Sequence, residues 1–360
     1  MQGVHTCSSH TDTRPLLLFV TYTGIGDLLM ALPLFGTLRS RFQVRPVIPP
    51  SHAGLAQILR QDGILEDYFV AQESLIFYRN PIGHLLTCRA LSRLQADVVM
   101  IYGKLMLAYC ARLGVLRGGH VLFCHPRGVA PRARGNFEVL PPTGNQVRDY
   151  FQFAEKLGVP VAPSRLCLTE GLQEQLARAA RPLIGCRSYA VVAPWTSDPR
   201  KNAPLRFFRE SIQTILTEGH LPVVITGLPR NRSAASILLR GFSDERVANL
   251  VGTTTLRQML GLLAGARFLL TNDGGTLHLA RLVGTPAIAA FGPTAPEQLL
   301  HDPARGLVTL RLGLPCSPCA NTPFHYRCPE RYLKCLRELE PSAARNSLLG
   351  ACQAAAGRAS

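Results

Sequence analysis

The sequence predicts an α/β protein made of two doubly wound, Rossmann-like domains that face a central cleft. Three observations predict this fold. Short apolar runs alternate with segments of helical periodicity, which is the pattern of a parallel sheet covered by helices on both faces. The alternation is interrupted once and begins again at residue 189, so the pattern occurs twice. The length of 360 residues suits two domains of ordinary size.

The first domain is expected at residues 15–163, after a disordered tail at 1–14. Apolar runs and helical spacing predict alternating elements: strands at 16–21, 44–48, 68–71 and 97–101, and helices at 28–38, 55–59, 85–94 and 146–157. The segment 126–142 contains four prolines and three arginines (Arg127, Arg132 and Arg134). It is therefore expected to be a flexible basic loop.

The second domain is expected at residues 189–340, with a linker region at 164–188 and a C-terminal helix or tail at 341–360. The same patterns predict strands at 189–193, 222–227, 247–250, 268–271 and 287–291, and helices at 205–218, 233–239, 256–264 and 277–283. In open α/β sheets ligands bind outside the carboxyl ends of the strands. Functional residues are therefore expected in the turns that follow strands, in the cleft between the domains.

The composition indicates a globular protein with an anionic partner. Hydrophobic residues are 47% and charged residues 17%, which excludes a disordered or coiled-coil chain. The formal net charge is +16, and 35 residues are arginine. This excess would attract a phosphorylated substrate or an anionic membrane face, and the alternative is an arginine-biased surface without a partner. No nucleic-acid-binding motif is present, so nucleic acid is not the expected partner. No apolar stretch reaches ~18 residues and no signal peptide is recognised, which predicts a cytoplasmic protein.

The first motif, Gly24-Ile25-Gly26-Asp27, follows the first strand and opens the first helix. Glycines at 24 and 26 permit a tight turn and let a ligand approach the backbone. The spacing is not a dinucleotide fingerprint, because its third glycine position is occupied by Leu29. The Asp27 carboxylate is a candidate general base aimed into the cleft, and the alternative is a helix cap.

The second motif, at residues 194–201, follows the first strand of the second domain. It holds the hydroxyls of Thr196 and Ser197 and the cations Arg200 and Lys201, and lysine is rare in this chain. Hydroxyls and cations at this spacing suit a diphosphate. An ordinary polar turn is the alternative.

The third motif, at residues 271–278, contains the strongest local signal. A strand ends in Asp273-Gly274-Gly275, and a helix begins at once with Thr276 and carries His278 one turn later. Free amides at a helix N-terminus bind phosphate, and the glycines leave their path open. For His278 the alternative is a histidine whose hydrogen bonds are satisfied within the fold.

The eleven cysteines do not suggest a disulfide framework, because seven are scattered along a large apolar-rich chain. Four occur late, at Cys316, Cys319, Cys328 and Cys335. Four thiolates can bind zinc, but the second pair is more widely spaced than in a zinc ribbon. Reduced thiols in a loop-rich segment are the alternative, and no metal ligand is assigned.

Together these motifs resemble glycosyltransferase family 9, the ADP-heptose:lipopolysaccharide heptosyltransferases. The resemblance runs in the family's order over roughly residues 15–340. It is carried by Gly-Ile-Gly-Asp-Leu-Leu with Pro33, the Lys201 loop, Thr-Asn-Asp-Gly-Gly-Thr-Leu-His-Leu-Ala with Gly-Thr-Pro, Phe-Gly-Pro-Thr and Cys-Ser-Pro-Cys. It implies a GT-B fold with the acceptor on the N-terminal domain and the nucleotide sugar on the C-terminal one.

The resemblance also implies an activity: inverting, metal-independent transfer of heptose from ADP-heptose to the lipopolysaccharide inner core or a lipid A acceptor, without a cofactor. Such an enzyme is expected at the cytoplasmic, anionic surface of the inner membrane as a peripheral protein. By position, Asp27 matches the family's catalytic base. The donor side matches at Thr196, Ser197 and Lys201 in the diphosphate loop, and at Asp273, Gly274, Gly275 and His278 in the donor-binding turn. Lys201 is expected to neutralise the departing diphosphate.

Two departures from the family pattern keep alternatives open. Arg230-Asn231-Arg232 follows Gly-Leu-Pro where the family often has an acidic residue that can hold the ribose, and the donor turn lacks the usual hydroxyl at Gly274. The alternatives are a transferase of the same fold using another nucleotide sugar, and a non-catalytic sugar-nucleotide-binding member. The absence of GxGxxG and GxxxxGK[ST] argues against an oxidoreductase or a kinase.

Overall fold

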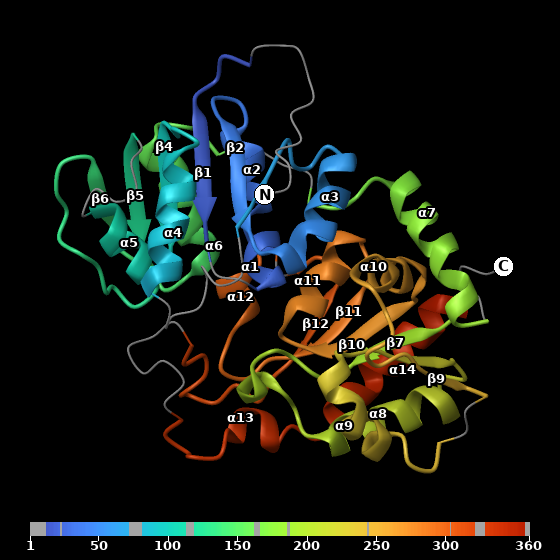
Figure 1. The fold of residues 1–360 in the computed structure, drawn as a ribbon. Coiled ribbons are helices and arrows are strands. Elements are labelled where there is room, and N and C mark those ends of the chain that lie inside the picture. Colours follow the sequence, from blue (N-terminus) through green and yellow to red (C-terminus); the bar gives the residue numbers. More distant parts are fainter. Residues whose placement is uncertain are drawn as a thin grey trace.

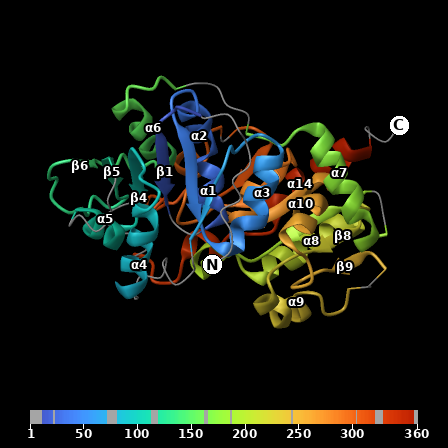
Figure 2. The ribbon, with the colours of Figure 1, turned by 45° about the horizontal axis from the view of Figure 1, so that its top comes forward.

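The computed structural model of the protein describes residues 12–21, 24–71, 81–112, 119–161, 166–185, 188–242, 245–302, 304–320 and 328–356. They form two α/β units, each with a six-stranded parallel sheet (Figure 1). The predicted pair of doubly wound units is confirmed. Figures 1 and 2 show the N-terminal unit in blue to green beside the C-terminal unit in yellow to red.

The N-terminal sheet has the order β3-β2-β1-β4-β5-β6. Its strands are β1 (Leu16–Val20), β2 (Gln43–Ile48), β3 (Phe69–Val70), β4 (Val98–Tyr102), β5 (His120–Cys124) and β6 (Phe137–Leu140). The helices of this unit are α1 (Ile25–Met30), α2 (Leu32–Leu38), α3 (Ala53–Gln61), α4 (Pro81–Ser92), α5 (Leu105–Arg112) and α6 (Gln146–Lys156). The predicted long helix at 28–38 is two helices, because Pro33 lies in the first turn of α2.

The C-terminal sheet has the order β12-β11-β10-β7-β8-β9. Its strands are β7 (Ala190–Ala193), β8 (Val223–Ile225), β9 (Val247–Asn249), β10 (Phe268–Asn272), β11 (Ala287–Ala290) and β12 (Leu307–Leu310). Its helices are α8 (Leu205–Thr217), α9 (Arg232–Leu238), α10 (Leu256–Gly265), α11 (Gly275–Leu282), α12 (Pro296–Leu299), α13 (Lys334–Arg337) and α14 (Ser342–Ala356). Helix α14 packs on α8.

Both sheets reverse their strand order at the same place in the topology. The reversal lies between β1 and β4 in the first sheet and between β7 and β10 in the second. Every residue of β4, β7 and β10 is buried, because helices cover both faces of each sheet. The turns after these central strands therefore lie at the switch point where ligands bind in such folds.

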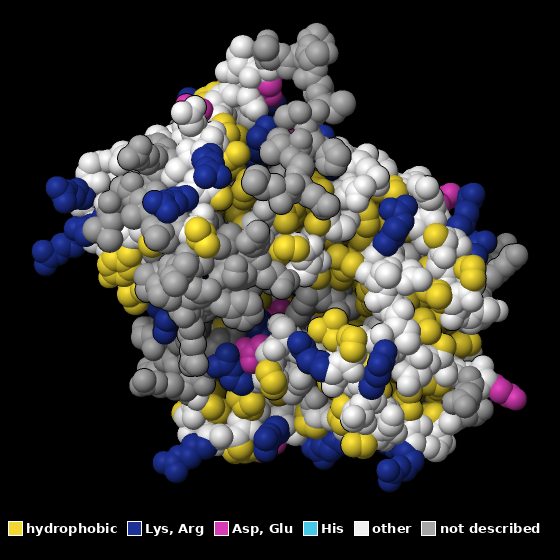
Figure 3. Space-filling view, viewed as in Figure 1, with side chains coloured by type: hydrophobic (Ala, Val, Ile, Leu, Met, Phe, Trp, Pro, Cys, Tyr) yellow, Lys and Arg dark blue, Asp and Glu magenta, His cyan; other side chains and the backbone are white. Residues whose placement is uncertain are grey.

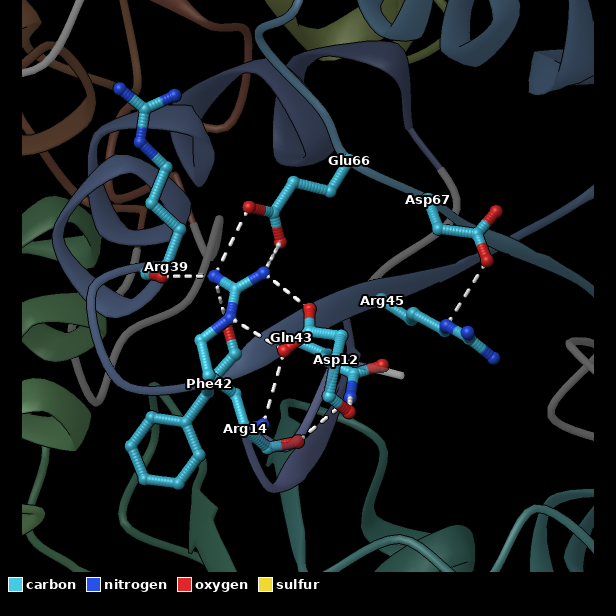
Figure 4. A network of polar contacts seen from close by, with 8 residues as sticks. All are labelled: Asp12, Arg14, Arg39, Phe42, Gln43, Arg45, Glu66 and Asp67. Carbon is cyan, nitrogen blue, oxygen red and sulfur yellow. Dashed lines mark hydrogen bonds and ion pairs between the residues drawn. The ribbon is translucent and has the colours of Figure 1, made fainter. Parts of the chain in front are cut away.

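The expected disordered tail is partly wrong, because residues 12–14 belong to a polar network on the N-terminal unit (Figure 4). The Arg14 guanidinium contacts Asp12 at 2.6 Å and Glu66 at 3.1 Å, and it donates to the carbonyl of Phe42 at 3.3 Å. Arg45 and Asp67 form a further ion pair at 3.1 Å. The rest of the predicted tail, residues 1–11, lies outside the described residues.

Two other segments are more regular than the sequence suggests. The predicted flexible loop at 126–142 contains β6, which pairs in parallel with β5, so that expectation is wrong for its last third. The predicted linker region at 164–188 contains α7 (Glu170–Ala180), which packs along α10. In the linker, residues 164–165 and 186–187 lie outside the described residues.

The face of the molecule in Figure 3 carries more basic than acidic side chains. They are scattered over both units on this face and do not form one continuous stripe. Among the residues that the structure describes, no helix combines the length and the apolar character needed to cross a bilayer.

Candidate active site

Helices α1 and α11 cross where the two units meet, and each begins in a turn after a central strand. The crossing is close. A side chain at Gly26 would place its Cβ 2.9 Å from Cδ2 of His278, and one at Gly275 would lie 3.7 Å from the Cβ of Ile25. Glycine at position 26 therefore lets the turn of one unit reach the turn of the other.

Hydrogen bonds on either side of this crossing tie the units together. The backbone N–H of Thr169 donates to the carboxylate of Asp62, at the end of α3, over 3.1 Å. The side-chain amide of Asn145 donates to the carbonyl of Glu297 in α12 over 2.7 Å. The turns of the site are thus held in a defined relation by contacts outside it.

The carboxylate of Asp27 accepts two hydrogen bonds from its own unit. Its Oδ1 accepts from Nε2 of Gln146 at 3.0 Å, and its Oδ2 accepts from the backbone N–H of Gly24 at 3.2 Å. The second bond satisfies an amide at the start of α1, so Asp27 does cap this helix.

The electrostatic environment of Asp27 goes beyond that of a cap. Desolvation by the surrounding protein raises the pKa of Asp27 above its ordinary value, although the Gln146 hydrogen bond and the charges of Lys201 and Lys104 lower it. The side chain is half-buried. The raised pKa and the influence of the Lys201 charge from the other unit keep Asp27 a candidate for a general base.

Lys201 and Asp273 form an ion pair on the C-terminal side. Nζ of Lys201 lies 2.6 Å from Oδ2 of Asp273, whose side chain is only 3% exposed. The hydroxyl of Thr294 donates to the same oxygen at 2.6 Å. Burial works to raise the pKa of Asp273, but the Lys201 charge and both hydrogen bonds hold it below its ordinary value. The carboxylate is therefore ionised, and it places the ammonium at the carboxyl end of the sheet.

The loop at residues 194–201 is fastened to β10 through Asn272. Its Nδ2 donates to the carbonyl of Pro194 at 2.6 Å, and its Oδ1 accepts from the N–H of Ala203 at 2.9 Å. Within the loop, the Thr196 hydroxyl donates to the carbonyl of Asp198 at 2.7 Å, whereas Ser197 is exposed. The Thr196 hydroxyl thus stabilises the turn, and the exposed Ser197 is the one open to solvent.

The turn at Gly274 is shaped by close contact with this loop. A Cβ at position 274 would lie 2.8 Å from Cγ2 of Thr196. Glycine in place of the family's usual hydroxyl residue therefore has a steric cause. Gly274 caps α11, Gly275 is its first residue, and Thr276 is half-buried in its first turn. Helix α11 therefore begins two residues after Asp273, the carboxylate that pairs with Lys201.

His278 is placed between the units. Its side chain is 7% exposed, and burial lowers its pKa to about 4, although the nearby Asp273 charge works in the opposite direction. The imidazole is therefore neutral at neutral pH. Its contact with Gly26 favours a role in joining α1 to α11.

Four polar residues near these turns were missed by sequence reasoning. They are Lys104, Gln146, Asn272 and Thr294. Lys104 follows β4, and burial lowers its pKa to about 8, whereas the Asp27 charge raises it. Asn272 ends β10 and Thr294 lies in the turn after β11, and a polar residue at such a strand end is a signal that the sequence offers. Gln146 carried none, because it is one polar residue at the start of an amphipathic helix.

The segment that departs from the family pattern is engaged in its own turn. Oδ1 of Asn231 accepts from the N–H of Leu228 at 3.0 Å, and the Arg232 guanidinium donates to the carbonyl of Gly252 at 2.8 Å. Arg230 is exposed. Arg232 is also exposed, but its guanidinium is engaged with Gly252.

The late cysteines lie near one another. Burial raises the pKa of Cys335 to about 11, with smaller contributions from Cys319, Cys328 and Cys316. Within the described part of the chain, no group of three or more histidine, cysteine, aspartate or glutamate side chains is arranged to hold a metal ion.

A cavity of about 590 Å³ lies between the units, along α1 and the later turns of α11. Leu29, His278 and Arg281 are among its lining residues, and Asp27, Lys201 and Asp273 are not. The cavity therefore reaches the α1–α11 crossing from the side away from the polar turns.

Comparison with known proteins matches both the fold and the motifs. The family model described as glycosyltransferase family 9 (heptosyltransferase) matches residues 136–328. Lipopolysaccharide heptosyltransferase 2 of Salmonella typhimurium is 29% identical over 152 residues, which are 40% of this chain and 42% of that protein. The chain thus spans about two fifths of the length of this curated relative.

Solved structures show the same architecture over nearly the whole chain. E. coli ADP-heptose lps heptosyltransferase II superposes with a TM-score of 0.68 at 18% identity, covering 94% of this chain and 98% of that one. E. coli heptosyltransferase WaaC with ADP gives 0.60 at 20% identity, covering 95% and 99%. These likenesses establish the GT-B-type fold. With a family match over more than half of its length and the family's motifs at the carboxyl ends of its central strands, the chain belongs to glycosyltransferase family 9.

Proposed function

We propose that the protein is an inverting, metal-independent glycosyltransferase that moves heptose from ADP-heptose to a hydroxyl of the lipopolysaccharide inner core. The observation that carries the proposal is that Asp27 lies within the electrostatic range of Lys201, which is paired with Asp273. The two groups come from different units, yet the Lys201 charge acts on the pKa of Asp27. In this proposal Asp27 is the base and Lys201 is the cation that binds the diphosphate at the same site.

The proposed reaction is a single displacement. The acceptor oxygen attacks the anomeric carbon of the donor, and its proton passes to the carboxylate of Asp27. The bond from the anomeric carbon to the diphosphate breaks, and its electron pair leaves with ADP. Because the acceptor attacks the face opposite the departing diphosphate, the anomeric configuration inverts. Lys201 and the free amides at the start of α11 stabilise the charge that develops on the diphosphate.

The names of the relatives support the choice of substrates. The Salmonella relative is a lipopolysaccharide heptosyltransferase, and one structural neighbour holds ADP. The exposed Arg230 and the turn at Asn231 leave another nucleotide sugar as the alternative donor. A non-catalytic member of the family is the second alternative.

A transfer assay tests the proposal and separates these alternatives. The purified protein is incubated with ADP-heptose and lipopolysaccharide from a heptose-deficient strain, and mass spectrometry follows the gain of one heptose. If transfer occurs only from a different nucleotide sugar, that sugar and not ADP-heptose is the donor. Thermal stabilisation by ADP without any transfer would identify a non-catalytic binder. ADP at 100 times its dissociation constant stabilises a folded protein by about 2.7 kcal/mol, so a thermal melt detects ADP binding readily.

Activity is expected to be independent of divalent metal. The sequence contains no Asp-x-Asp pair that could hold Mg²⁺ or Mn²⁺ on a diphosphate, and Lys201 with the α11 N-terminus supplies positive charge there. Initial rates should be equal after treatment with EDTA and after later addition of Mn²⁺. Loss of activity in EDTA that Mn²⁺ restores would contradict this expectation.

Binding to an anionic membrane surface is expected to depend on the loop that carries Arg127, Arg132 and Arg134. All three are exposed, and Val129 between them is 45% exposed. Near-surface cations contribute about 1 kcal/mol each to such binding, and salt shortens the Debye length from ~10 Å at 0.1 M to ~3 Å at 1 M. Vesicles containing anionic lipid should therefore co-sediment with the protein at low salt and much less at high salt, and replacing the three arginines by serine should weaken binding.

A charge-matched control distinguishes this loop from the general basic character of the chain. Replacing Arg178, Arg240 and Arg257 by serine removes the same charge from exposed positions outside the N-terminal unit. This variant should retain more vesicle binding than the loop variant. Equal losses in both variants, or binding that salt does not weaken, would show that the loop is not the docking site.

A further inference from the structure

Gln146, the first residue of α6, is buried beside the proposed base. The residue is 6% exposed. Its Nε2 donates to Oδ1 of Asp27 at 3.0 Å and to the hydroxyl of Tyr150 at 2.7 Å. The Tyr150 hydroxyl in turn lies 3.1 Å from the hydroxyl of Thr21, at the end of β1. A continuous polar chain therefore connects the base to the core of the N-terminal unit.

The chemistry of an amide determines what Gln146 can do in this chain. The Nε2 group has two hydrogens, and each has its own acceptor. Because the tyrosine bond holds one hydrogen, the other is directed at Asp27. A fixed donor of this kind favours the ionised carboxylate over the protonated one. The Gly24 amide donates to the other oxygen of Asp27, so both carboxylate oxygens have fixed directions.

The backbone that carries Gln146 is itself held in place. Asn145 caps α6, since its Oδ1 accepts from the N–H of Arg148 at 2.9 Å. Its amide donates to the carbonyl of Glu297 in the C-terminal unit. The first turn of α6 is thus attached to the unit that carries Lys201, next to the residue that contacts the base.

We propose that Gln146 is a positioning residue that keeps the Asp27 carboxylate ionised and directed toward the acceptor hydroxyl. This inference rests on the proposed function, in which Asp27 is the general base. Burial alone raises the pKa of Asp27, and the Gln146 hydrogen bond is the largest influence that opposes it. Without that bond, a base of this kind is protonated over a wider pH range and is inactive there.

The test is the pH dependence of turnover in Gln146→Met, which keeps the length of the side chain and removes both donors. The acid limb of the kcat profile should move upward by about 1 to 2 pH units, because the lost hydrogen bond joins a charged group. The rate should then fall about 10- to 100-fold at pH values below the limb and much less on the plateau. Affinity for ADP should change less than twofold, since Lys201 and Asp273 remain intact.

Gln152→Met is the matched control on the same helix. Gln152 donates to the carbonyl of Pro141 at 3.1 Å and does not contact Asp27. The acid limb of the kcat profile of Gln152→Met should coincide with that of the unmutated protein. Gln146→Glu is a second variant of nearly identical shape, and its added negative charge should move the limb further in the same direction.

The outcomes separate this proposal from the function on which it rests. If the unmutated protein transfers no sugar, the proposed function fails. If it transfers sugar and the acid limbs of Gln146→Met and Gln146→Glu match that of the unmutated protein, Gln146 does not position the base. Equal shifts in Gln146→Met and Gln152→Met would assign the effect to α6 in general and would also overturn the proposal.

Discussion

Asp27→Asn is expected to reduce single-turnover transfer by about 10²- to 10⁴-fold, the usual contribution of a general base. Asparagine keeps the shape of the side chain, but its single oxygen can accept from Gln146 or from the Gly24 amide and not from both, and it cannot take up the proton of the acceptor. Affinity for ADP should be nearly unchanged, because the diphosphate-binding groups lie on the other unit. Rapid-quench kinetics and calorimetry measure the two quantities separately. A decrease smaller than tenfold would leave Asp27 as a helix cap alone.

The stability of the same variant provides an internal control. The pKa of Asp27 is higher in the folded protein than in the unfolded chain. Between the pKa of Asp27 in the unfolded chain and its pKa in the folded protein, the folded state binds more protons. The free energy of unfolding therefore falls as pH rises through this range. Asparagine removes this cost. The melting temperature of Asp27→Asn relative to that of the unmutated protein should therefore be highest near pH 7 and should fall as pH approaches the ordinary aspartate value of ~3.9, because the hydrogen bond that asparagine loses costs the same at every pH.

Lys201→Ala is expected to weaken both ADP binding and the chemical step. The diphosphate gains charge as the bond to the sugar breaks, so the ammonium interacts more strongly with the transition state than with the bound donor. Loss of one such preorganised group typically costs about 10²- to 10³-fold in rate. Lys201→Arg should restore only part of this, because a planar guanidinium does not replace a compact ammonium. Unchanged ADP affinity together with an unchanged rate in Lys201→Ala would remove this residue from the site.

A stability effect accompanies Lys201→Ala and needs its own control. The substitution leaves the buried carboxylate of Asp273 without its cation, and breaking a buried pair costs ~3–5 kcal/mol, with the lower end expected because Lys201 is partly exposed. Adding Asp273→Asn to Lys201→Ala removes the unpaired charge. The double variant should regain much of the lost melting temperature and none of the lost activity. Recovery of activity with stability would show that Lys201 acts only on folding.

Much of the architecture was predictable because it depends on local patterns. Fully buried strands such as β7 and β10 appear in the sequence as short apolar runs, and the helices between them show apolar residues at helical spacing. The repeat of this alternation after residue 189 was enough to predict two doubly wound units. Strand β6 was missed because prolines on both sides of it outweighed its four residues, and it is defined by pairing with β5.

The sequence by itself also determined which chemical groups occupy the turns of the candidate site. Asp27, Lys201 and Asp273 each follow or adjoin a predicted strand end, and in a parallel sheet those ends lie on one side. Short-range rules of this kind require only the order of residues along one segment. The same rules predicted a turn with accessible backbone amides at the start of α11, because two glycines precede the rest of that helix.

Only the tertiary structure decided how these groups act on one another. The contact between Gly26 and His278, the ion pair of Lys201 with Asp273, and the hydrogen bond from Gln146 to Asp27 each join residues 72 or more positions apart. The first contact joins the two units and the other two lie within one unit, but all three depend on the packing of segments that are distant in the sequence, and no local periodicity encodes them. The pKa of Asp27 has the same origin, because desolvation and the fields of distant charges exist only once the chain has folded.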